Sequence, residues 1–191
     1  MTRRNLFSSA ALAAAAVAGV GLFAPDVSAA PPPAVGETAK DFTLNDLAGK
    51  PVKLSAETAK GPVVQLVLRG YPGYQCPLCT RQVGEFLAAA KEFEDKGARL
   101  LLVYPGPAEN LQTHAKDFFG EKAPPANVVL LTDPDFTFTE AYNLRWKASG
   151  ETAYPSTFVV GADGAIKFAV VSKTHGGRTK ATDVLKAVPA R

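Results

Sequence analysis

The sequence has few of the side chains that bind metals or cross-link a fold. Its 191 residues include two cysteines and two histidines. A structural zinc ion generally takes four such ligands, and His114 and His175 are isolated from each other and from the cysteines. Only two residues separate Cys76 from Cys79, so a disulfide between them would contribute only about 2 kcal/mol on the chain-entropy model. Neither a zinc-centred fold nor a long-range disulfide framework is therefore expected.

A large excess of charge of one sign is missing as well. The formal net charge is +3, and it falls to +2 if Arg3, Arg4 and Asp26 are removed with the first 29 residues. The basic residues are scattered along the chain. Because nucleic acids and acidic membranes attract proteins through concentrated positive charge, neither is an expected partner.

The longest uncharged stretch lies near the N-terminus, where the alanine-rich residues 5–25 follow the pair Arg3-Arg4. Small residues at Ser28 and Ala29 complete a pattern that is typical of an export signal, and the paired arginines resemble a twin-arginine signal. We interpret residues 1–29 as a cleaved signal and expect a periplasmic or otherwise exported protein without stable membrane insertion. An uncleaved anchor is the alternative, but alanine and glycine supply little of the apolarity that a stable span needs.

The rest of the chain is interpreted as a proline-rich lead-in, residues 30–36, followed by one domain, residues 37–191. Apolar runs of strand length alternate in this domain with segments of helical periodicity. The alternation predicts an α/β fold in which helices flank a central mixed sheet, with an N-terminal β-hairpin as an extension. The expected strands and hairpins cover residues 41–55, 63–68, 99–104, 127–133 and 156–171, and the expected helices cover residues 79–96, 108–119, 136–142 and 182–188.

Both cysteines follow the second apolar run directly, in the segment RGYPGYQCPLCTR. Pro77 suits the first position of a helix, which places Cys76 at the helix N-cap and Cys79 one turn inside. Free amides and the positive end of the helix dipole favour a thiolate at Cys76. A thiolate beside a second thiol is suited to exchanging disulfides or to resolving a sulfenic acid. We therefore expect an accessible, redox-active pair.

Four stretches resemble the thioredoxin-fold superfamily and, within it, the peroxiredoxin-like group of the alkyl hydroperoxide reductase and thiol-specific antioxidant family. They are VGETAKDFTLNDLAGKPVKLS, VLRGYPGYQCPLC, YPSTFVVGADGAIKFAVV and HGGRTKATDVLKAV, which lie between residues 35 and 188. The resemblance implies a thioredoxin-like fold and a thiol oxidoreductase, either a peroxidase or a disulfide reductase. It also implies a peroxide or disulfide substrate, an external thioredoxin-like dithiol as electron donor, and no cofactor or metal.

The family pattern Pro-x-x-x-Thr/Ser-x-x-Cys begins here at Pro72. Cys79 occupies the position of the peroxide-attacking thiolate, and Cys76 replaces the threonine or serine, although a thiol is a weaker hydrogen-bond donor than a hydroxyl. Thioredoxin-like reductases attack with the first cysteine instead, which would make Cys76 the nucleophile. The family spacing favours Cys79 and the pKa argument favours Cys76, so the sequence leaves both open.

The resemblance also implies residues that position the substrate. Peroxiredoxins stabilise the thiolate with an arginine, and the candidates are Arg69, Arg81 and Arg178, the last of which matches an arginine in the tail of peroxiredoxin-like relatives. Pro72 belongs to the cysteine turn. Pro155 resembles the cis proline that packs beside the cysteines of thioredoxin folds; otherwise it is a residue at the start of a strand.

A rival hypothesis from another class is copper delivery. Thioredoxin-fold metallochaperones bind Cu(I) through two cysteines and a distant histidine, for which His175 is the candidate. Those proteins usually separate their cysteines by three residues, whereas CPLC separates them by two. We therefore rank a peroxidase first, an oxidoreductase of protein disulfides second and a copper chaperone last.

Overall fold

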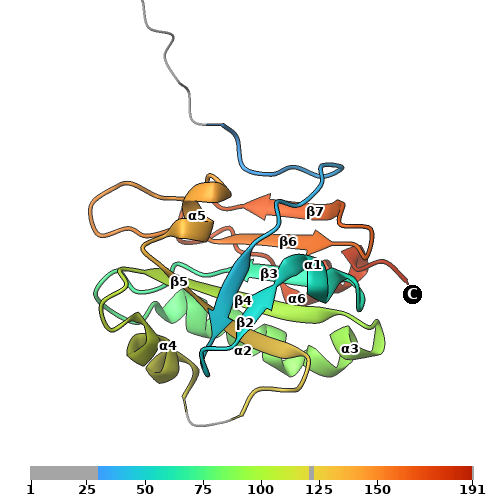
Figure 1. Ribbon diagram of the computed structural model, residues 1–191, viewed down its shortest axis with the longest axis horizontal. Helices are drawn as coiled ribbons and strands as arrows, with labels where there is room; N and C mark the ends of the chain where they lie inside the picture. Colours follow the sequence, from blue (N-terminus) through green and yellow to red (C-terminus); the bar gives the residue numbers. More distant parts are fainter. Residues whose placement is uncertain (1–29, 121–122, 191) are drawn as a thin grey trace, which may run out of the picture.

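The computed structural model describes residues 30–120 and 123–190 (Figure 1). The predicted export signal, residues 1–29, lies outside the described residues. Within the described ranges, no helix combines the length and the hydropathy that a bilayer crossing requires.

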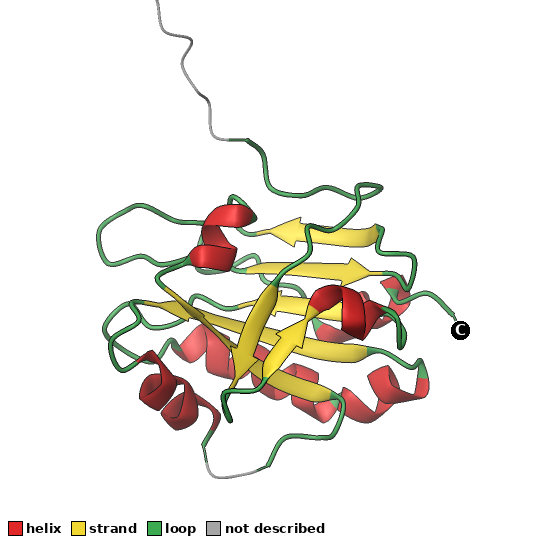
Figure 2. Ribbon diagram, in the orientation of Figure 1, coloured by secondary structure: helices red, strands yellow, loops and turns green. Residues whose placement is uncertain are grey.

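In this part of the chain, seven strands form one sheet, and helices cover both of its faces (Figure 2). The strand order is β2-β1-β5-β4-β3-β6-β7, in which β3, β4 and β5 are parallel and the other neighbours are antiparallel. The predicted α/β fold with a mixed central sheet is confirmed. The strands are β1 (Thr43–Asp46), β2 (Pro51–Lys53), β3 (Val63–Val67), β4 (Arg99–Gly106), β5 (Val128–Pro134), β6 (Ser156–Val160) and β7 (Ile166–Val171), and the helices are α1 (Leu54–Thr58), α2 (Pro77–Ala88), α3 (Ala90–Asp95), α4 (Leu111–Phe119), α5 (Thr137–Ala141) and α6 (Ala181–Ala187).

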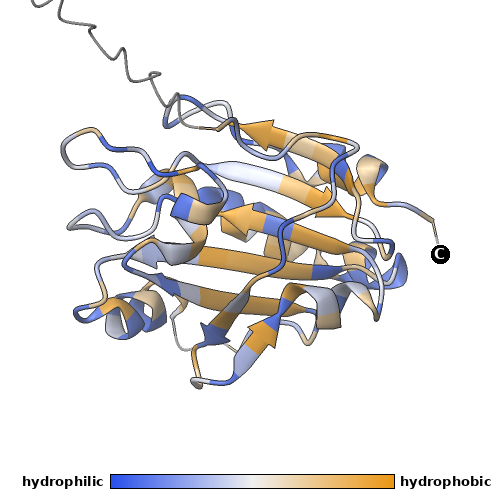
Figure 3. Ribbon diagram, turned by 45° about the horizontal axis from the view of Figure 1, so that its top comes forward, coloured by the Kyte–Doolittle hydropathy of each residue, from blue (hydrophilic) through white to orange (hydrophobic). Residues whose placement is uncertain are grey.

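Strand β3 divides the apolar interior into two layers. Successive side chains of a strand point to opposite faces, so Val64 and Leu66 pack with α2, α3, α4 and α6, while Val63 and Val67 pack with α1 and α5. Every residue of β3 is buried, as expected for a strand covered on both faces. Figure 3 shows the central strands largely in the hydrophobic colour. The end of β3 is therefore a rigid starting point for the cysteine segment that follows.

Both predicted hairpins are present, and each turns at a glycine with positive φ. Gly49 has a φ of +80° between β1 and β2, and Gly164 has a φ of +77° between β6 and β7. The N-terminal hairpin is part of the main sheet rather than a separate extension, because Asn45 of β1 pairs with Thr132 of β5.

The helix predicted over residues 79–96 and the strand predicted over residues 99–104 differ from the structure. The helix expected to run to Gly97 is divided into α2 and α3 at Ala89, whose φ of −92° and ψ of 4° depart from helical values. Strand β4 continues through Pro105 to Gly106, beyond the predicted end at residue 104. The Pro105 carbonyl accepts a hydrogen bond from the Tyr71 N–H where β3 has already ended, so the missing N–H of Pro105 interrupts no pairing with β3. The short helix α1 was not predicted.

Candidate active site

Both cysteines lie in the first turn of α2, beyond the C-terminal end of β3. Cys76 is the N-cap residue and Pro77 occupies the first turn, as predicted. The Thr80 N–H donates to the Cys76 carbonyl over 3.1 Å, which closes this turn. Both cysteines are free thiols.

The expectation that the sulfurs are accessible is wrong for this structure. Cys76 is 4% exposed and Cys79 is 1% exposed. Cys79 shares the buried face of α2 with Val83 and Phe86, which pack toward the sheet. On another side, the Arg178 guanidinium contacts both sulfurs, with its Nη2 3.4 Å from Cys79 Sγ and 3.8 Å from Cys76 Sγ. A reactant therefore needs at least a side-chain movement to reach the pair.

The two thiols differ in acidity. The pKa of Cys76 is lowered to about 5, chiefly by a hydrogen bond from the Cys79 thiol. Burial opposes this shift, whereas the backbone N–H groups of Leu78 and Cys79 and the charge of Arg178 favour it. The pKa of Cys79 is raised because its proton is held by Cys76 and because the thiol is buried. Cys76 is therefore the more acidic thiol of the pair, and the Cys79 thiol donates the hydrogen bond that stabilises its thiolate.

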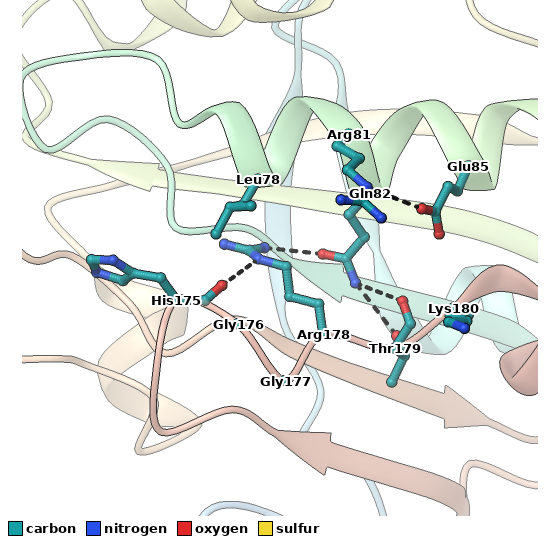
Figure 4. Close-up of a pocket in the computed structure, with 10 residues that line it drawn as sticks. All are labelled: Leu78, Arg81, Gln82, Glu85, His175, Gly176, Gly177, Arg178, Thr179 and Lys180. Atoms are coloured by element: carbon teal, nitrogen blue, oxygen red, sulfur yellow. Dashed lines mark hydrogen bonds and ion pairs between the residues drawn. The ribbon is translucent and has the colours of Figure 1, made fainter.

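Arg178 is held in place by acceptors on two segments (Figure 4). Its Nη1 donates to Gln82 Oε1 and its Nε to the His175 carbonyl, each over 3.0 Å. Gln82 in turn donates to the Thr179 carbonyl over 3.3 Å. Gln82 was not among the residues predicted from the sequence, although its position three residues after Cys79 on a helix puts it on the same helical face.

Arg69 contributes its backbone rather than its guanidinium. Its N–H donates to Cys79 Sγ over 3.3 Å. The side chain is buried and points to another segment, where Nε donates to Glu151 Oε2 over 2.8 Å and Nη2 donates to the Gly150 carbonyl over 2.7 Å. The expectation that Arg69 could bring its charge to the thiolate is therefore not met. Glu151 was not singled out from the sequence.

Among the described residues, no hydrogen bond joins the other candidates to the sulfurs. The Arg81 side chain is 79% exposed and lies 3.6 Å from Glu85. Pro72 lines a separate cavity of about 530 Å³ together with Tyr71 and other residues. Every peptide bond within the described ranges is trans, so the expected cis bond before Pro155 is wrong. Trans is the common isomer for proline, and Pro155 leads directly into β6, which fits the alternative of a strand start.

A cavity of about 190 Å³ is lined in part by Arg178, the residue that contacts both sulfurs (Figure 4). Leu78, which separates the two cysteines, lines it together with Gln82 and His175. Arg178 belongs both to this lining and to the immediate contacts of the thiols. Arg178 therefore connects the lining of this cavity to the two thiols.

Neither histidine lies with the cysteines as a metal ligand would. His175 Nε2 is 2.9 Å from Glu151 Oε1, and the His114 ring stacks on Tyr71 with ring centroids 3.6 Å apart. Among residues 30–120 and 123–190, no three side chains of histidine, cysteine, aspartate or glutamate are grouped to hold a metal ion. The copper hypothesis thus gains no third ligand from this part of the chain.

Comparisons with known proteins agree in sequence and in fold. The model of the AhpC/TSA family matches residues 35–169. The putative peroxiredoxin bcp of Helicobacter pylori is 31% identical over 153 residues, which cover 74% of this chain and 91% of that protein. The 1-Cys peroxiredoxin PER1 of Hordeum vulgare is 26% identical over 160 residues, which cover 81% of this chain and 71% of that protein. The crystal structure of peroxidoxin BcpB from Mycobacterium tuberculosis has a TM-score of 0.62 at 25% identity and covers 80% of this chain and 94% of that chain. The resemblance and the thioredoxin-like fold predicted from the sequence are confirmed.

Proposed function

Because this chain belongs to the AhpC/TSA family, we propose that it is an exported thiol peroxidase whose Cys76 and Cys79 alternate between dithiol and disulfide. The observation that carries the proposal is the contact of one arginine with both sulfurs: Arg178 Nη2 lies 3.8 Å from Cys76 Sγ and 3.4 Å from Cys79 Sγ. A fixed positive charge at this place stabilises both the thiolate and the charge that develops on a departing oxygen.

In the proposed reaction, Cys76 attacks because it carries the negative charge. Its sulfur bonds to one oxygen of the hydroperoxide, the O–O bond breaks, and the other oxygen leaves as hydroxide or alkoxide and takes up a proton. Cys76 is then a sulfenic acid, oxidised by two electrons. The Cys79 thiol attacks this sulfur and a water molecule is released, which leaves a disulfide between the two residues.

An external dithiol of the thioredoxin type completes the proposed cycle. It attacks the disulfide, passes through a mixed disulfide and leaves Cys76 and Cys79 reduced while it is itself oxidised. The lowered pKa of Cys76 supports this step, since a thiol of low pKa is a good leaving group. For export, the support is the pattern of residues 1–29, with its paired arginines and its alanine-rich stretch.

Limited hydrogen peroxide treatment of two variants, followed by mass spectrometry, tests the roles of the cysteines. We expect Cys79→Ser to stop at a sulfenic acid on Cys76, because no resolving thiol remains. We expect Cys76→Ser to react much more slowly. A sulfenic acid on Cys79 in the Cys76→Ser variant, with none on Cys76 in the other variant, would reverse the two roles. The proposed peroxidase function would be rejected if stopped-flow measurements showed that the wild-type thiols react with hydrogen peroxide no faster than free cysteine does.

A second candidate is exchange with protein disulfides. The observation that favours it is the thiolate at a helix N-cap with a thiol one turn inside, an arrangement suited to exchange in both directions. The rate of reduction of a model protein disulfide, compared with the rate of peroxide reduction on the same preparation, separates the two functions. We expect peroxide to react faster, because both sulfurs are buried.

A further inference from the structure

Glu151 connects the two segments that contact the cysteines. Its Oε2 accepts from Arg69 Nε over 2.8 Å, and its Oε1 lies 2.9 Å from His175 Nε2. It belongs to the loop between α5 and β6, apart from both partners in the sequence. The Glu151 side chain is only 12% exposed, so solvent screens these contacts less than it screens a surface ion pair.

The backbone of each partner of Glu151 is connected to the sulfurs, directly for Arg69 and through Arg178 for His175. The Arg69 N–H donates to Cys79 Sγ over 3.3 Å. The His175 carbonyl accepts from Arg178 Nε over 3.0 Å, and Arg178 contacts both sulfurs. One carboxylate therefore connects the segment that presents an N–H to Cys79 with the loop that presents a guanidinium to both thiols.

The loop that carries Arg178 has an exposed outer part. Residues 173–177 are all exposed, and Ser172 Oγ bonds within the same loop to the Thr174 carbonyl over 2.8 Å. The imidazole of His175 reaches out of this loop to Glu151, and the Trp146 ring, also from the α5–β6 loop, lies 5.1 Å from it. The contact with Glu151 thus attaches the exposed part of the loop to a buried charge.

We propose that Glu151 is a positioning residue for the thiol chemistry: it holds the loop of residues 172–179 against Arg69, so that Arg178 stays in contact with both sulfurs. The catalytic meaning of this inference rests on the proposed peroxidase function. The effect on the thiolate does not, because it can be measured in the absence of peroxide.

The sign of the effect separates positioning from simple electrostatics. If Glu151 acted only as a nearby negative charge, its replacement by glutamine would stabilise the thiolate and lower its apparent pKa. If Glu151 holds Arg178 in place, the same replacement loosens a positive charge beside the sulfurs and raises the apparent pKa.

The test is an ultraviolet titration of the thiolate in the full chain, with wild-type and Glu151→Gln proteins, together with stopped-flow oxidation by hydrogen peroxide. We expect the apparent pKa of the thiolate to rise by about one unit in the variant. We expect the rate constant for peroxide to fall about tenfold, since a small misplacement of a charged group is costly.

Glu57 provides a matched control at the other end of the sheet. It is also a buried carboxylate with two cationic partners, Arg99 Nε and Lys60 Nζ, each 2.7 Å from one of its oxygens. Arg99 begins β4, opposite Val63 at the beginning of β3, whereas the cysteines follow the other end of β3. Glu57→Gln should reduce stability to a similar degree and leave the thiolate pKa unchanged.

The proposal is overturned if Glu151→Gln leaves the thiolate pKa unchanged or lowers it, or if Glu57→Gln raises it equally. Should Glu151→Gln fail to fold, His175→Ala tests the same connection, because it keeps the pair of Arg69 and Glu151. We expect it to raise the thiolate pKa as well; an unchanged value would contradict the proposal. A wild-type protein that does not reduce peroxide would remove the proposed function, while the titrations would still decide whether Glu151 positions Arg178.

Discussion

Gln82 and Arg178 are joined by a hydrogen bond of 3.0 Å although 96 positions separate them in the sequence. Gln82 Oε1 accepts from Arg178 Nη1 on the helix whose first turn carries both cysteines. The positive charge is thus attached to the same helix as the sulfurs, in addition to its attachment to the His175 carbonyl of the loop that supplies Arg178.

Gln82→Ala should slow the reaction with peroxide about tenfold, since hydrogen bonds to charged groups contribute roughly 1.5 to 3 kcal/mol. The measurement is the stopped-flow rate constant at neutral pH. Gln112 serves as the control, because its side chain also donates to a backbone carbonyl, that of Leu47, over 2.6 Å, away from the cysteines. Equal rates for Gln82→Ala and Gln112→Ala would contradict this role of Gln82.

The pKa of Cys76 is lowered to about 5. The rate at which Cys76 reacts with an alkylating agent should therefore rise with pH around a midpoint of about 5 and be constant near neutral pH. Cys79→Ala should move this midpoint upward, because it removes the hydrogen bond that lowers the pKa most. A midpoint near that of an ordinary thiol, about 8.5, in the wild-type protein would show that Cys76 is not activated.

The same lowered pKa predicts a pH-dependent contribution of Cys76 to stability. The contribution of its thiolate is complete above the ordinary thiol pKa of about 8.5, decreases as the pH falls, and is lost below about 5. The free energy of unfolding of wild-type protein minus that of Cys76→Ser should therefore increase as the pH rises from about 5 to about 8.5. A constant difference would contradict the prediction.

Gly177→Ala should displace the loop that carries Arg178. Gly177 has a φ of +66°, and a Cβ there would lie 2.9 Å from Ser172 Oγ. We expect a loss of about 1 to 2 kcal/mol of stability together with slower oxidation. Gly164→Ala is the control, since its φ is +77° with open space around the new Cβ; it should cost stability with no effect on the oxidation rate. Chemical denaturation and stopped-flow oxidation measure the two effects.

The reduced protein should bind much less than one equivalent of Cu(I). Arg178 places a positive charge 3.4 Å from Cys79 Sγ, and His175 contacts Glu151 rather than the cysteines. Metal analysis after dialysis measures the binding. Stoichiometric copper that is lost in the His175→Ala variant would revive the copper hypothesis.

Local patterns were sufficient to predict the elements that place the cysteines. The apolar run of β3 and the turn at Gly164 are encoded by neighbouring residues, and Pro77 fixes the beginning of α2. The helix start also indicated Cys76 as the more acidic thiol, although the largest cause of its lowered pKa is the hydrogen bond from Cys79 and the backbone N–H groups of the first turn contribute less.

Contacts between segments that are distant in the sequence could not be predicted from local patterns. The positions of Gln82 and Glu151 matter because a loop around Arg178 folds back onto them, and no local pattern encodes that return. The burial of both sulfurs depends partly on the same loop, since Arg178, which contacts them, lies about 100 residues further along the chain. Arg69 was predicted to bring its guanidinium charge to the thiolate because it lies close to the cysteines in the sequence. In the structure, its backbone N–H contacts Cys79 instead.

Because both sulfurs are buried, we expect the size of a reactant to affect how readily it reaches them. We expect a small hydroperoxide to reach the buried sulfurs with less displacement of the surrounding side chains than a disulfide on the surface of a folded protein would require. For the same reason we expect the thiolate to react more slowly with bulky electrophiles than with small ones.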